Sequence, residues 1–172
     1  VAALTTAGVR AVGLTGADGA CGLSDIAPLH RTVDGREVSL GRVGIPIRSA
    51  GTDVIQVLVA GGVVPVVACI GIDREGRLLN VNADTLAGFL AAQLQADSLV
   101  VSGTTAGVLD PAGQTIPLLD RGGVDRLIGD GTATAGMVAK LRACAEALAA
   151  GVGEVIIVDG RDRAALLAGI DG

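Results

Sequence analysis

Short runs of apolar residues alternate with longer amphipathic segments along this chain. The apolar runs are rich in Val and Ile and show little polar alternation, which is typical of strands buried on both faces of a sheet. They predict strands at Arg10–Leu14, Val63–Ile72, Ser98–Ser102 and Glu154–Asp159. The amphipathic segments predict helices at Val1–Ala7, Thr52–Ala60, Asp84–Gln95, Gly136–Ala150 and Arg163–Ala168. This alternation predicts an α/β fold with a mainly parallel sheet and helices on both sides.

Two segments depart from this alternation. Arg31–Val43 contains the turn dipeptide Asp34-Gly35 between short mixed runs, which predicts a β-hairpin. Asp73–Gly76 predicts a second tight turn, between the strand that ends at Ile72 and a short strand at Leu78–Asn82.

Composition narrows the classes of function. The chain has 172 residues, half of them apolar, which is enough for one domain or two small lobes with a core. A net charge of −5, with one Phe and no Tyr or Trp, argues against nucleic acid as a partner. We expect no membrane span and no zinc site, and we assign no residue as a metal ligand. Three cysteines outside any CxxC pair favour a reducing, cytoplasmic compartment.

The first candidate site is the glycine-rich stretch Gly129–Lys140, which leads into a predicted helix. Lys140 is the only lysine among thirteen basic residues. A cation in the first turns opposes the helix dipole, whereas a bound phosphate would be attracted by both the lysine and the helix N-terminus. The spacing differs from a Walker A loop, because Met137 stands where that motif has Lys. An ordinary capped helix with a solvated lysine is the alternative interpretation.

The second candidate is Asn80-Val-Asn-Ala-Asp84. In an extended segment, residues 80, 82 and 84 point to one face. Two carboxamides and a carboxylate there could bind a carboxylate substrate and hold an ammonium group or a magnesium ion. The alternative is that Asn82 or Asp84 only caps the following helix.

Two glycine-rich loops follow predicted strands. Ser102–Gly107 offers small and hydroxyl side chains at the carboxyl end of a strand, which suits a ligand crevice in an open α/β sheet, although a plain polar turn explains it equally. Gly13–Gly22 does not match GxGxxG and is interpreted as a close approach of backbones. His30, the only histidine, receives no role.

In this order, the motifs resemble the amino-acid kinase superfamily, and acetylglutamate kinases in particular. Five stretches carry the resemblance, and the similarity covers nearly the whole chain. They are Val12–Gly19, Leu40-Gly-Arg-Val-Gly44, Val64–Gly71 with Gly76, Asn80-Val-Asn-Ala-Asp84 and Gly136-Met-Val-Ala-Lys140.

The resemblance implies a three-layer αβα sandwich and transfer of the γ-phosphoryl group of ATP, with Mg²⁺, to the side-chain carboxylate of N-acetyl-L-glutamate in arginine biosynthesis. It gives Lys140 and Asp84 catalytic roles: Lys140 neutralises charge on the transferring group and Asp84 orients the catalytic lysines. Asn80 and Asn82 would bind the acyl substrate. The implied nucleotide-binding residues are Thr104, Thr105, Ala106, Gly107, Val108, Leu109, Thr132, Ala133, Thr134 and Gly136.

Two departures from the family pattern qualify this assignment. The first catalytic lysine in its Lys-x-Gly-Gly strand, the His-Gly-Gly-Gly loop and the substrate-clamping arginine are not in this chain. The loop Ser102–Gly107 is one residue longer than usual and has Gly103 or Thr104 at an acidic position. We therefore expect the N-terminal portion of the fold to be missing and this chain alone to be inactive.

The expected division has part of the acyl-substrate lobe at residues 1–84 and the nucleotide-binding lobe at residues 85–172. We also expect a homo-oligomer, dimeric or larger. Two other functions remain open: a kinase for a carrier-protein-linked aminoadipate or glutamate, and a non-catalytic nucleotide-binding or regulatory module.

Overall fold

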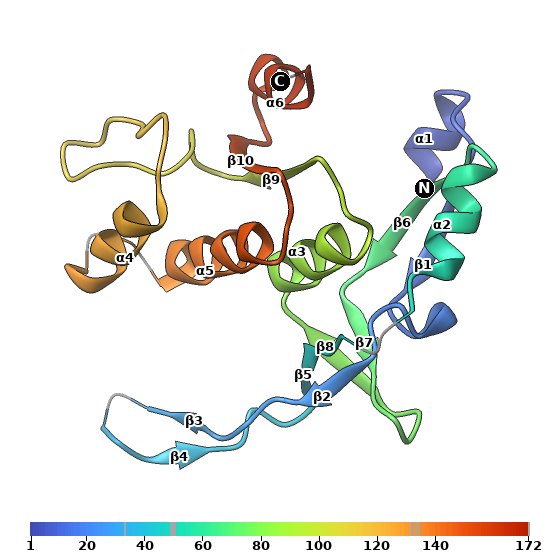
Figure 1. Ribbon diagram of the computed structural model, residues 1–172, viewed down its shortest axis with the longest axis horizontal. Helices are drawn as coiled ribbons and strands as arrows, with labels where there is room; N and C mark the ends of the chain where they lie inside the picture. Colours follow the sequence, from blue (N-terminus) through green and yellow to red (C-terminus); the bar gives the residue numbers. More distant parts are fainter. Residues whose placement is uncertain (33, 49–50, 132, 134, 172) are drawn as a thin grey trace. The chain divides into compact units, whose positions relative to one another are not determined.

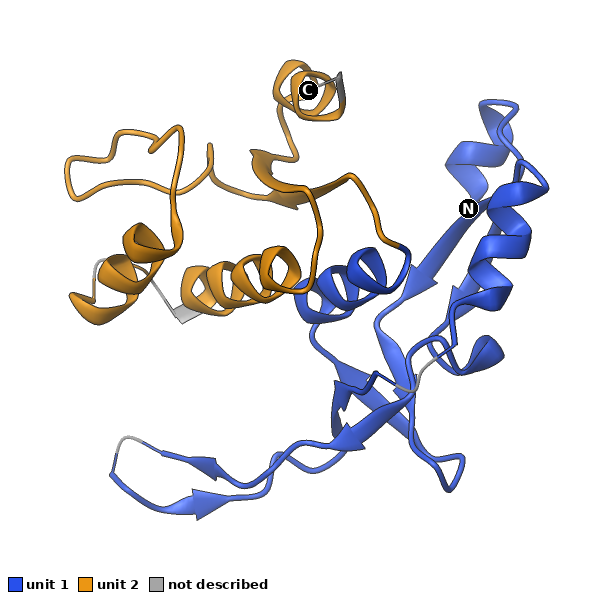
Figure 2. Cartoon of the chain, viewed as in Figure 1, with its two compact units in different colours: residues 1–94 blue, residues 95–172 orange. Residues whose placement is uncertain are grey.

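The computed structural model describes residues 1–172 apart from 33, 49–50, 132, 134 and 172, and it describes no side chain at 135 and 171. The chain divides into two compact units, Val1–Leu94 and Gln95–Gly172 (Figure 2). Among the described residues, no helix has the length and apolar character needed to span a membrane.

Unit 1 contains a two-stranded parallel sheet. Strand β1, Ala11–Thr15, pairs with β6, Val64–Ala68, in a register that sets Ala11 opposite Val64. Helices α1, Ala2–Thr6, and α2, Asp53–Ala60, belong to the same unit (Figure 1). These elements confirm the helices and the first strand expected from the apolar pattern.

The single strand predicted at Val63–Ile72 is wrong, because the chain changes sheets at Cys69. Strand β6 ends at Ala68, and β7, Ile70–Ile72, pairs instead with β8, Leu78–Val81, in antiparallel fashion. Gly71 allows this change of partner, since a Cβ on it would lie 2.7 Å from the Gly22 carbonyl oxygen. A continuous apolar run does not reveal which sheet each half joins.

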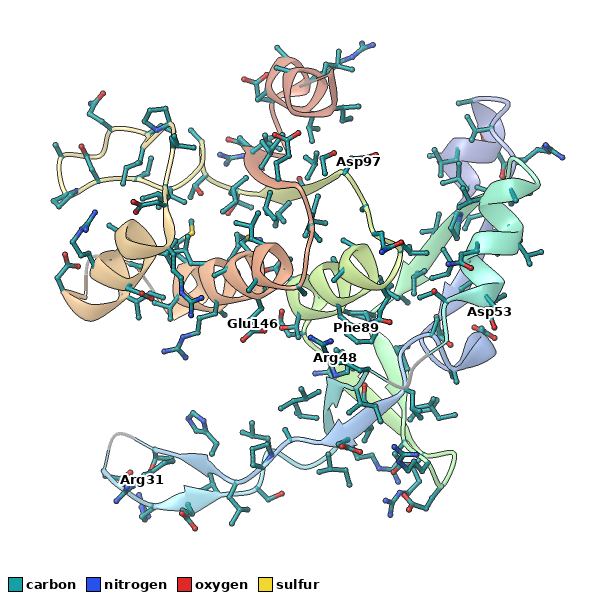
Figure 3. The ribbon with its side chains drawn as sticks, in the orientation of Figure 1. Arg31, Arg48, Asp53, Phe89, Asp97 and Glu146 are labelled. Atoms are coloured by element: carbon teal, nitrogen blue, oxygen red, sulfur yellow. The ribbon has the colours of Figure 1, made fainter. Side chains whose placement is uncertain are left out.

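The second sheet of unit 1 has four strands in the order β2-β5-β8-β7. Strands β2, Ser24–Ile26, and β5, Val43–Pro46, were not predicted as separate strands, and β5 runs parallel to β8. The hairpin expected near residues 31–43 is confirmed as β3, His30–Arg31, paired with β4, Glu37–Val38. It extends from the β2 and β5 strands, with Arg31 far along it (Figure 3).

The turn predicted at Asp73–Gly76 is closed by the Asp73 carboxylate. It accepts hydrogen bonds from the backbone amides of Glu75 (3.0 Å) and Arg77 (2.8 Å) and pairs with the Arg77 guanidinium at 2.6 Å. Burial by itself acts to raise the pKa of Asp73, but the bonds from Arg77 outweigh it and the pKa is lowered. The turn therefore depends on an ionised carboxylate.

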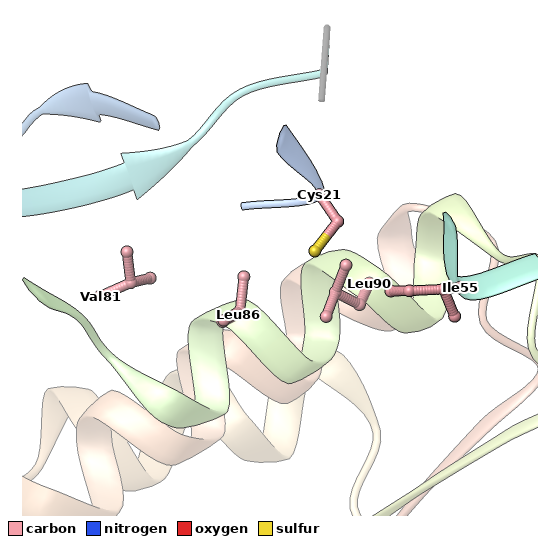
Figure 4. Packing of buried hydrophobic residues seen from close by; sticks show 5 residues of the cluster. All are labelled: Cys21, Ile55, Val81, Leu86 and Leu90. Carbon is pink, nitrogen blue, oxygen red and sulfur yellow. The ribbon is translucent and has the colours of Figure 1, made fainter. Parts of the chain in front are cut away.

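The core of unit 1 forms around α3, Ala83–Gln93. Leu86 and Leu90 from this helix pack with Cys21, Ile55 and Val81 (Figure 4). Cys21 is preceded by the short 3₁₀ helix η1, Asp18–Ala20. The chain's one aromatic residue, Phe89, packs against the same cluster. Val81 places the end of β8 in this core, which fixes the point where the strand passes into α3.

Unit 2 is built around strands β9, Ser98–Gly103, and β10, Glu154–Asp159, which are parallel and paired from Glu154–Ser98 to Asp159–Gly103. Helix α6, Arg163–Asp171, packs with Gly169 against Ile156 and Val158. Helix α5, Ala135–Ala149, contacts the opposite face, where Leu141 and Ile157 share a cluster. Because side chains alternate along a strand, the sheet lies between helices, as the predicted αβα layering requires (Figure 1).

One helix of unit 2 was not predicted. Helix α4 covers Arg121–Gly129, and the Asp120 carboxylate caps it by accepting a hydrogen bond from the Gly123 amide at 2.7 Å. Two adjacent glycines in its first turn weaken intrinsic helix propensity. Burial of Leu127 beside Val108 and Leu141 stabilises the helix instead, and tertiary packing of that kind is not visible in the sequence.

Candidate functional site

Asn80 lies in β8 at the centre of the four-stranded sheet of unit 1. Its neighbours across the two adjoining strands are Val43 in β5 and Ile70 in β7. Its backbone amide donates to the Arg42 carbonyl at 2.7 Å. The side chain of Asn80 is exposed, while its neighbours in sequence, Leu79 and Val81, are only 2% and 1% exposed. The sheet therefore fixes the backbone of Asn80 and leaves its carboxamide exposed, where it can meet a ligand.

Asn82 is the N-cap of α3. Its Oδ1 accepts a hydrogen bond from the Thr85 amide at 3.0 Å and one from the Thr85 hydroxyl at 3.3 Å. The capping role raised as an alternative is therefore confirmed for Asn82. A cap satisfies a helix amide that would otherwise have no partner in the helix.

The expectation that residues 80, 82 and 84 lie along one extended segment is wrong. Strand β8 ends at Val81 and α3 begins at Ala83, which places Asp84 in the first turn of the helix. The side chain of Asp84 is half-buried. A carboxylate in this turn interacts favourably with the helix dipole. Asn80, Asn82 and Asp84 thus surround one strand-to-helix junction, but they do not share a strand face.

The loop Thr104–Leu109 follows β9 at its carboxyl end and is tied to the segment after it. The Thr105 hydroxyl donates to the Gly107 carbonyl at 3.0 Å, and the Thr115 hydroxyl donates to the Ala106 carbonyl at 3.3 Å. Thr104 and Leu109 are exposed, whereas Val108 is 7% exposed and belongs to the cluster around Leu127 and Leu141. Burial of Val108 therefore attaches the loop to this apolar cluster.

Lys140 lies in the second turn of α5, and its side chain reaches the carboxyl end of β9. A Cβ built on Gly103 would stand 3.9 Å from Lys140 Cε. Lys140 is half-buried, and Gly136 in the first turn of the same helix is exposed. The end of the Lys140 side chain therefore lies beside the last residue of β9.

The remaining predicted nucleotide-binding residues lie just before α5. Thr132 and Thr134 are outside the described residues. Ala133 is half-buried, and its amide donates to the Leu127 carbonyl at 3.2 Å. Among the predicted residues of unit 2, Lys140 is the one that the structure places close to Gly103, just before the predicted loop Thr104–Leu109.

The end of β10 contributes charged groups that the sequence analysis did not single out. Asp159, opposite Gly103 in the β9–β10 register, pairs with the Arg161 guanidinium at 2.7 Å. The hydrogen bonds from the Arg161 side chain and amide lower the pKa of Asp159 to about 2. The sequence signal was present, because Asp159-Gly160 follows an apolar strand just as Ser102-Gly103 does.

A hollow of 720 Å³ lies along the apolar stripe of α5. Leu141, Cys144 and Leu148 line it from the helix, and Val155 and Ile157 line it from β10. Neither Lys140 nor Gly103 is among its lining residues. Gly107 and Val108 of the predicted nucleotide loop also line it, so the hollow adjoins that loop but not the Lys140 side chain.

The described residues contain no group of three or more His, Cys, Asp or Glu side chains arranged to hold a metal ion. Mg²⁺ is commonly held by one or two carboxylates together with substrate phosphates, so it does not need such a group. The chemistry available is instead a positioned ammonium in unit 2 and a positioned carboxamide in unit 1. Both suit the binding of anionic oxygen atoms.

The amino acid kinase family matches residues 1–159. An acetylglutamate kinase from Parvibaculum lavamentivorans is 38% identical over 173 residues, which is 97% of this chain and 56% of that protein. The chain therefore spans about half the length of the curated relatives it matches.

Solved structures give the same result for the fold. The crystal structure of smu.665 from Streptococcus mutans is 31% identical, with a TM-score of 0.79, over 92% of this chain and 60% of that one. A carbamate kinase from Giardia, 18% identical, has a TM-score of 0.65 over 97% of this chain and 62% of its own. The second likeness concerns the fold alone.

Proposed function

The chain belongs to the amino acid kinase family, and we propose that it provides the nucleotide-handling residues and part of the acyl-substrate site for phosphorylation of N-acetyl-L-glutamate by ATP. The observation that carries the proposal is the Lys140 arm, which lies beside Gly103 at the carboxyl end of β9. Relatives named acetylglutamate kinase, such as the 38% identical one, support the choice of substrate.

The proposed reaction joins an oxygen of the substrate's side-chain carboxylate to the γ-phosphorus of ATP. As that bond forms, the bond from the γ-phosphorus to the β–γ bridging oxygen breaks, and its electron pair leaves with ADP. The product is an acyl phosphate, as arginine biosynthesis requires. No proton needs to be removed from an ionised carboxylate, so the protein needs no general base for this step.

Catalysis of phosphoryl transfer consists mainly of positioning and of neutralising charge. Lys140 supplies a compact positive charge for the oxygens of the transferring group. Mg²⁺, held by the nucleotide phosphates, would supply further neutralisation when bound. The loop Thr104–Leu109 and the segment Thr132–Gly136 would hold the nucleotide.

In unit 1, the Asn80 carboxamide would bind the acylated amino acid, since it can donate to a carboxylate and accept from an amide. Asp84 would orient catalytic lysines, of which Lys140 is the one present in this chain. Asn82 would fix the junction between β8 and α3 through its hydrogen bond with Thr85. We also propose that the full-length protein acts as a homo-oligomer.

Trapping of the acyl phosphate with hydroxylamine tests the proposal. A full-length protein carrying this chain should form the hydroxamate from N-acetyl-L-glutamate and MgATP, while the 172-residue chain alone should bind MgATP and form none. A full-length protein that forms hydroxamate only from a carrier-protein-linked substrate would contradict the choice of substrate. Failure with every carboxylate, despite nucleotide binding, would favour a regulatory module.

A further inference from the structure

The turn between β10 and α6 is held by two acidic side chains. Asp159 accepts hydrogen bonds from the Arg161 amide at 3.0 Å, from Arg161 Nε at 2.9 Å and from Nη2 at 2.7 Å. Asp162 accepts from the Ala164 and Ala165 amides at the start of α6, at 2.8 and 3.3 Å. The side chain of Asp159 is only 16% exposed. Bonds at both ends of the turn leave it little freedom to move.

Gly160, inside this turn, lies directly against the end of β9. Its amide donates to the Gly103 carbonyl at 2.9 Å. A Cβ on Gly160 would overlap the Ser102 hydroxyl oxygen and would lie 3.3 Å from both Ser102 Cβ and the Gly103 oxygen. Gly160 does not have a positive φ. A side chain here would therefore have to turn the Ser102 hydroxyl away and would still approach Ser102 Cβ and the Gly103 oxygen closely, so close contact and not backbone conformation disfavours it.

Gly103, the last residue of β9, also lies beside the Lys140 side chain. The Cβ position of Gly103 is 3.9 Å from Lys140 Cε and 4.0 Å from the Thr105 amide nitrogen. Gly103 is thus in contact with the β10–α6 turn through its carbonyl and lies close to Lys140 and the predicted nucleotide loop. A displacement of Gly160 would be transmitted through Gly103 to both.

We propose that Gly160 is a positioning residue for the nucleotide: it sets the end of β9, and through it the Lys140 arm and the loop Thr104–Leu109. The inference rests on the nucleotide-binding role proposed above for unit 2. Its physical basis is that displacements of about 1 Å at a phosphoryl-binding group reduce binding or rate by large factors.

The chain offers a matched control at the other end of the same strand. Gly153 precedes β10, and a Cβ on it would lie 2.6 Å from the carbonyl oxygen of Asp97, the residue before β9 (Figure 3). Gly153→Ala therefore strains the same pair of strands at their amino ends, away from Lys140. It reproduces the loss of stability without disturbing Gly103.

The test measures the Kd of MgATP for the 172-residue chain by titration calorimetry, together with Tm by far-ultraviolet circular dichroism. Gly160→Ala should raise Kd by roughly tenfold or more, while Gly153→Ala changes it by less than about twofold at a similar loss of Tm. Adding Ser102→Ala to Gly160→Ala removes the overlapping hydroxyl and should recover part of the affinity, relative to Ser102→Ala alone. Equal effects of the two alanine variants, or no recovery, would overturn the inference.

The inference can also be tested if Gly160→Ala does not fold or if the unmodified chain does not bind MgATP. If Gly160→Ala does not fold, Arg161→Gln loosens the same turn without an overlap and should raise Kd about threefold, whereas an unchanged Kd would overturn the inference. Failure of the unmodified chain to bind MgATP would overturn the nucleotide role and this inference together. Binding by the unmodified chain with an unchanged Kd in Gly160→Ala would overturn only the inference.

Discussion

Unit 1 and unit 2 carry different kinds of polar group among their candidate functional residues. In unit 1 the groups are the carboxamides of Asn80 and Asn82, at a junction where a strand passes into α3 without an intervening loop. In unit 2 they are the Lys140 ammonium and the Asp159–Arg161 ion pair, at strand ends closed by glycines. Under the proposed function, this difference predicts a division of roles, with acyl-substrate recognition in unit 1 and neutralisation of phosphate charge in unit 2.

The largest effect expected from this division concerns Lys140. In the full-length protein, Lys140→Arg should lower kcat by roughly 10²-fold or more, because a planar guanidinium does not reproduce a compact ammonium at the transferring group. Steady-state kinetics with both substrates would measure this. Arg142→Lys, an exposed exchange on the same helix, is the control. A kcat unchanged by Lys140→Arg would remove the charge-handling role from unit 2.

A second variant tests the recognition role of unit 1. Asn80→Ala should raise KM for N-acetyl-L-glutamate about tenfold, with KM for ATP little changed, since a hydrogen bond to a charged group is lost. Initial rates with each substrate varied in turn give the two values. An equal rise in both KM values would indicate destabilisation of the sheet and not loss of a substrate contact.

A third variant separates the two roles considered for Asn82. Asn82→Ala should lower the free energy of unfolding by about 1 kcal/mol, because α3 loses its cap. Asn82→Asp retains a capping oxygen and should retain the stability, as measured by urea denaturation. If Asn82 also contacts the acyl substrate, Asn82→Asp will still raise KM for it. Unchanged KM in Asn82→Asp would leave Asn82 with the capping role alone.

The smallest expected effect is a pH dependence that the two units share. The pKa of Asp159 is lowered to about 2, and that of Asp73 is lowered as well, so each ionised carboxylate stabilises the folded state. This stabilisation is complete above the unfolded pKa near 4 and disappears as pH falls toward the folded value. The Tm advantage over Asp159→Asn should therefore shrink between about pH 4 and pH 2, and the advantage over Asp73→Asn should shrink as the pH falls below about 4. A constant advantage across that range would contradict the ion-pair assignment.

The sequence predicted those features that depend on local pattern. The strand at Glu154–Asp159, the helix at Arg163 and the hairpin turn at Asp34-Gly35 follow from runs of apolar residues and from turn chemistry. The change of sheet at Cys69 did not follow, since both halves of the run are equally apolar.

The less predictable features of the site depend on contacts between distant segments. Gly160 matters because Ser102 approaches it from another strand, and nothing in its own neighbourhood in the sequence reveals this. Asn82 caps α3 through Thr85, and the motif alone allowed either that role or a substrate contact. Residue type and spacing therefore identified the candidate residues. Which of them also have a structural role depends on packing and hydrogen bonds that the sequence does not reveal.

The position of the single aromatic residue makes the two units differ in their spectroscopic signals. Phe89 packs against the cluster around Cys21 and Leu90, and the chain has no other aromatic residue. Unit 2 has no aromatic ring, and free thiols and thioethers do not contribute to near-ultraviolet circular dichroism, so unit 2 gives no signal there. Because the chain has no Trp, fluorescence at the wavelengths of Trp is absent throughout. A single Phe89→Trp exchange would make unfolding of unit 1 visible against a dark background, so that the melting of each unit can be followed separately by combining fluorescence with far-ultraviolet signals.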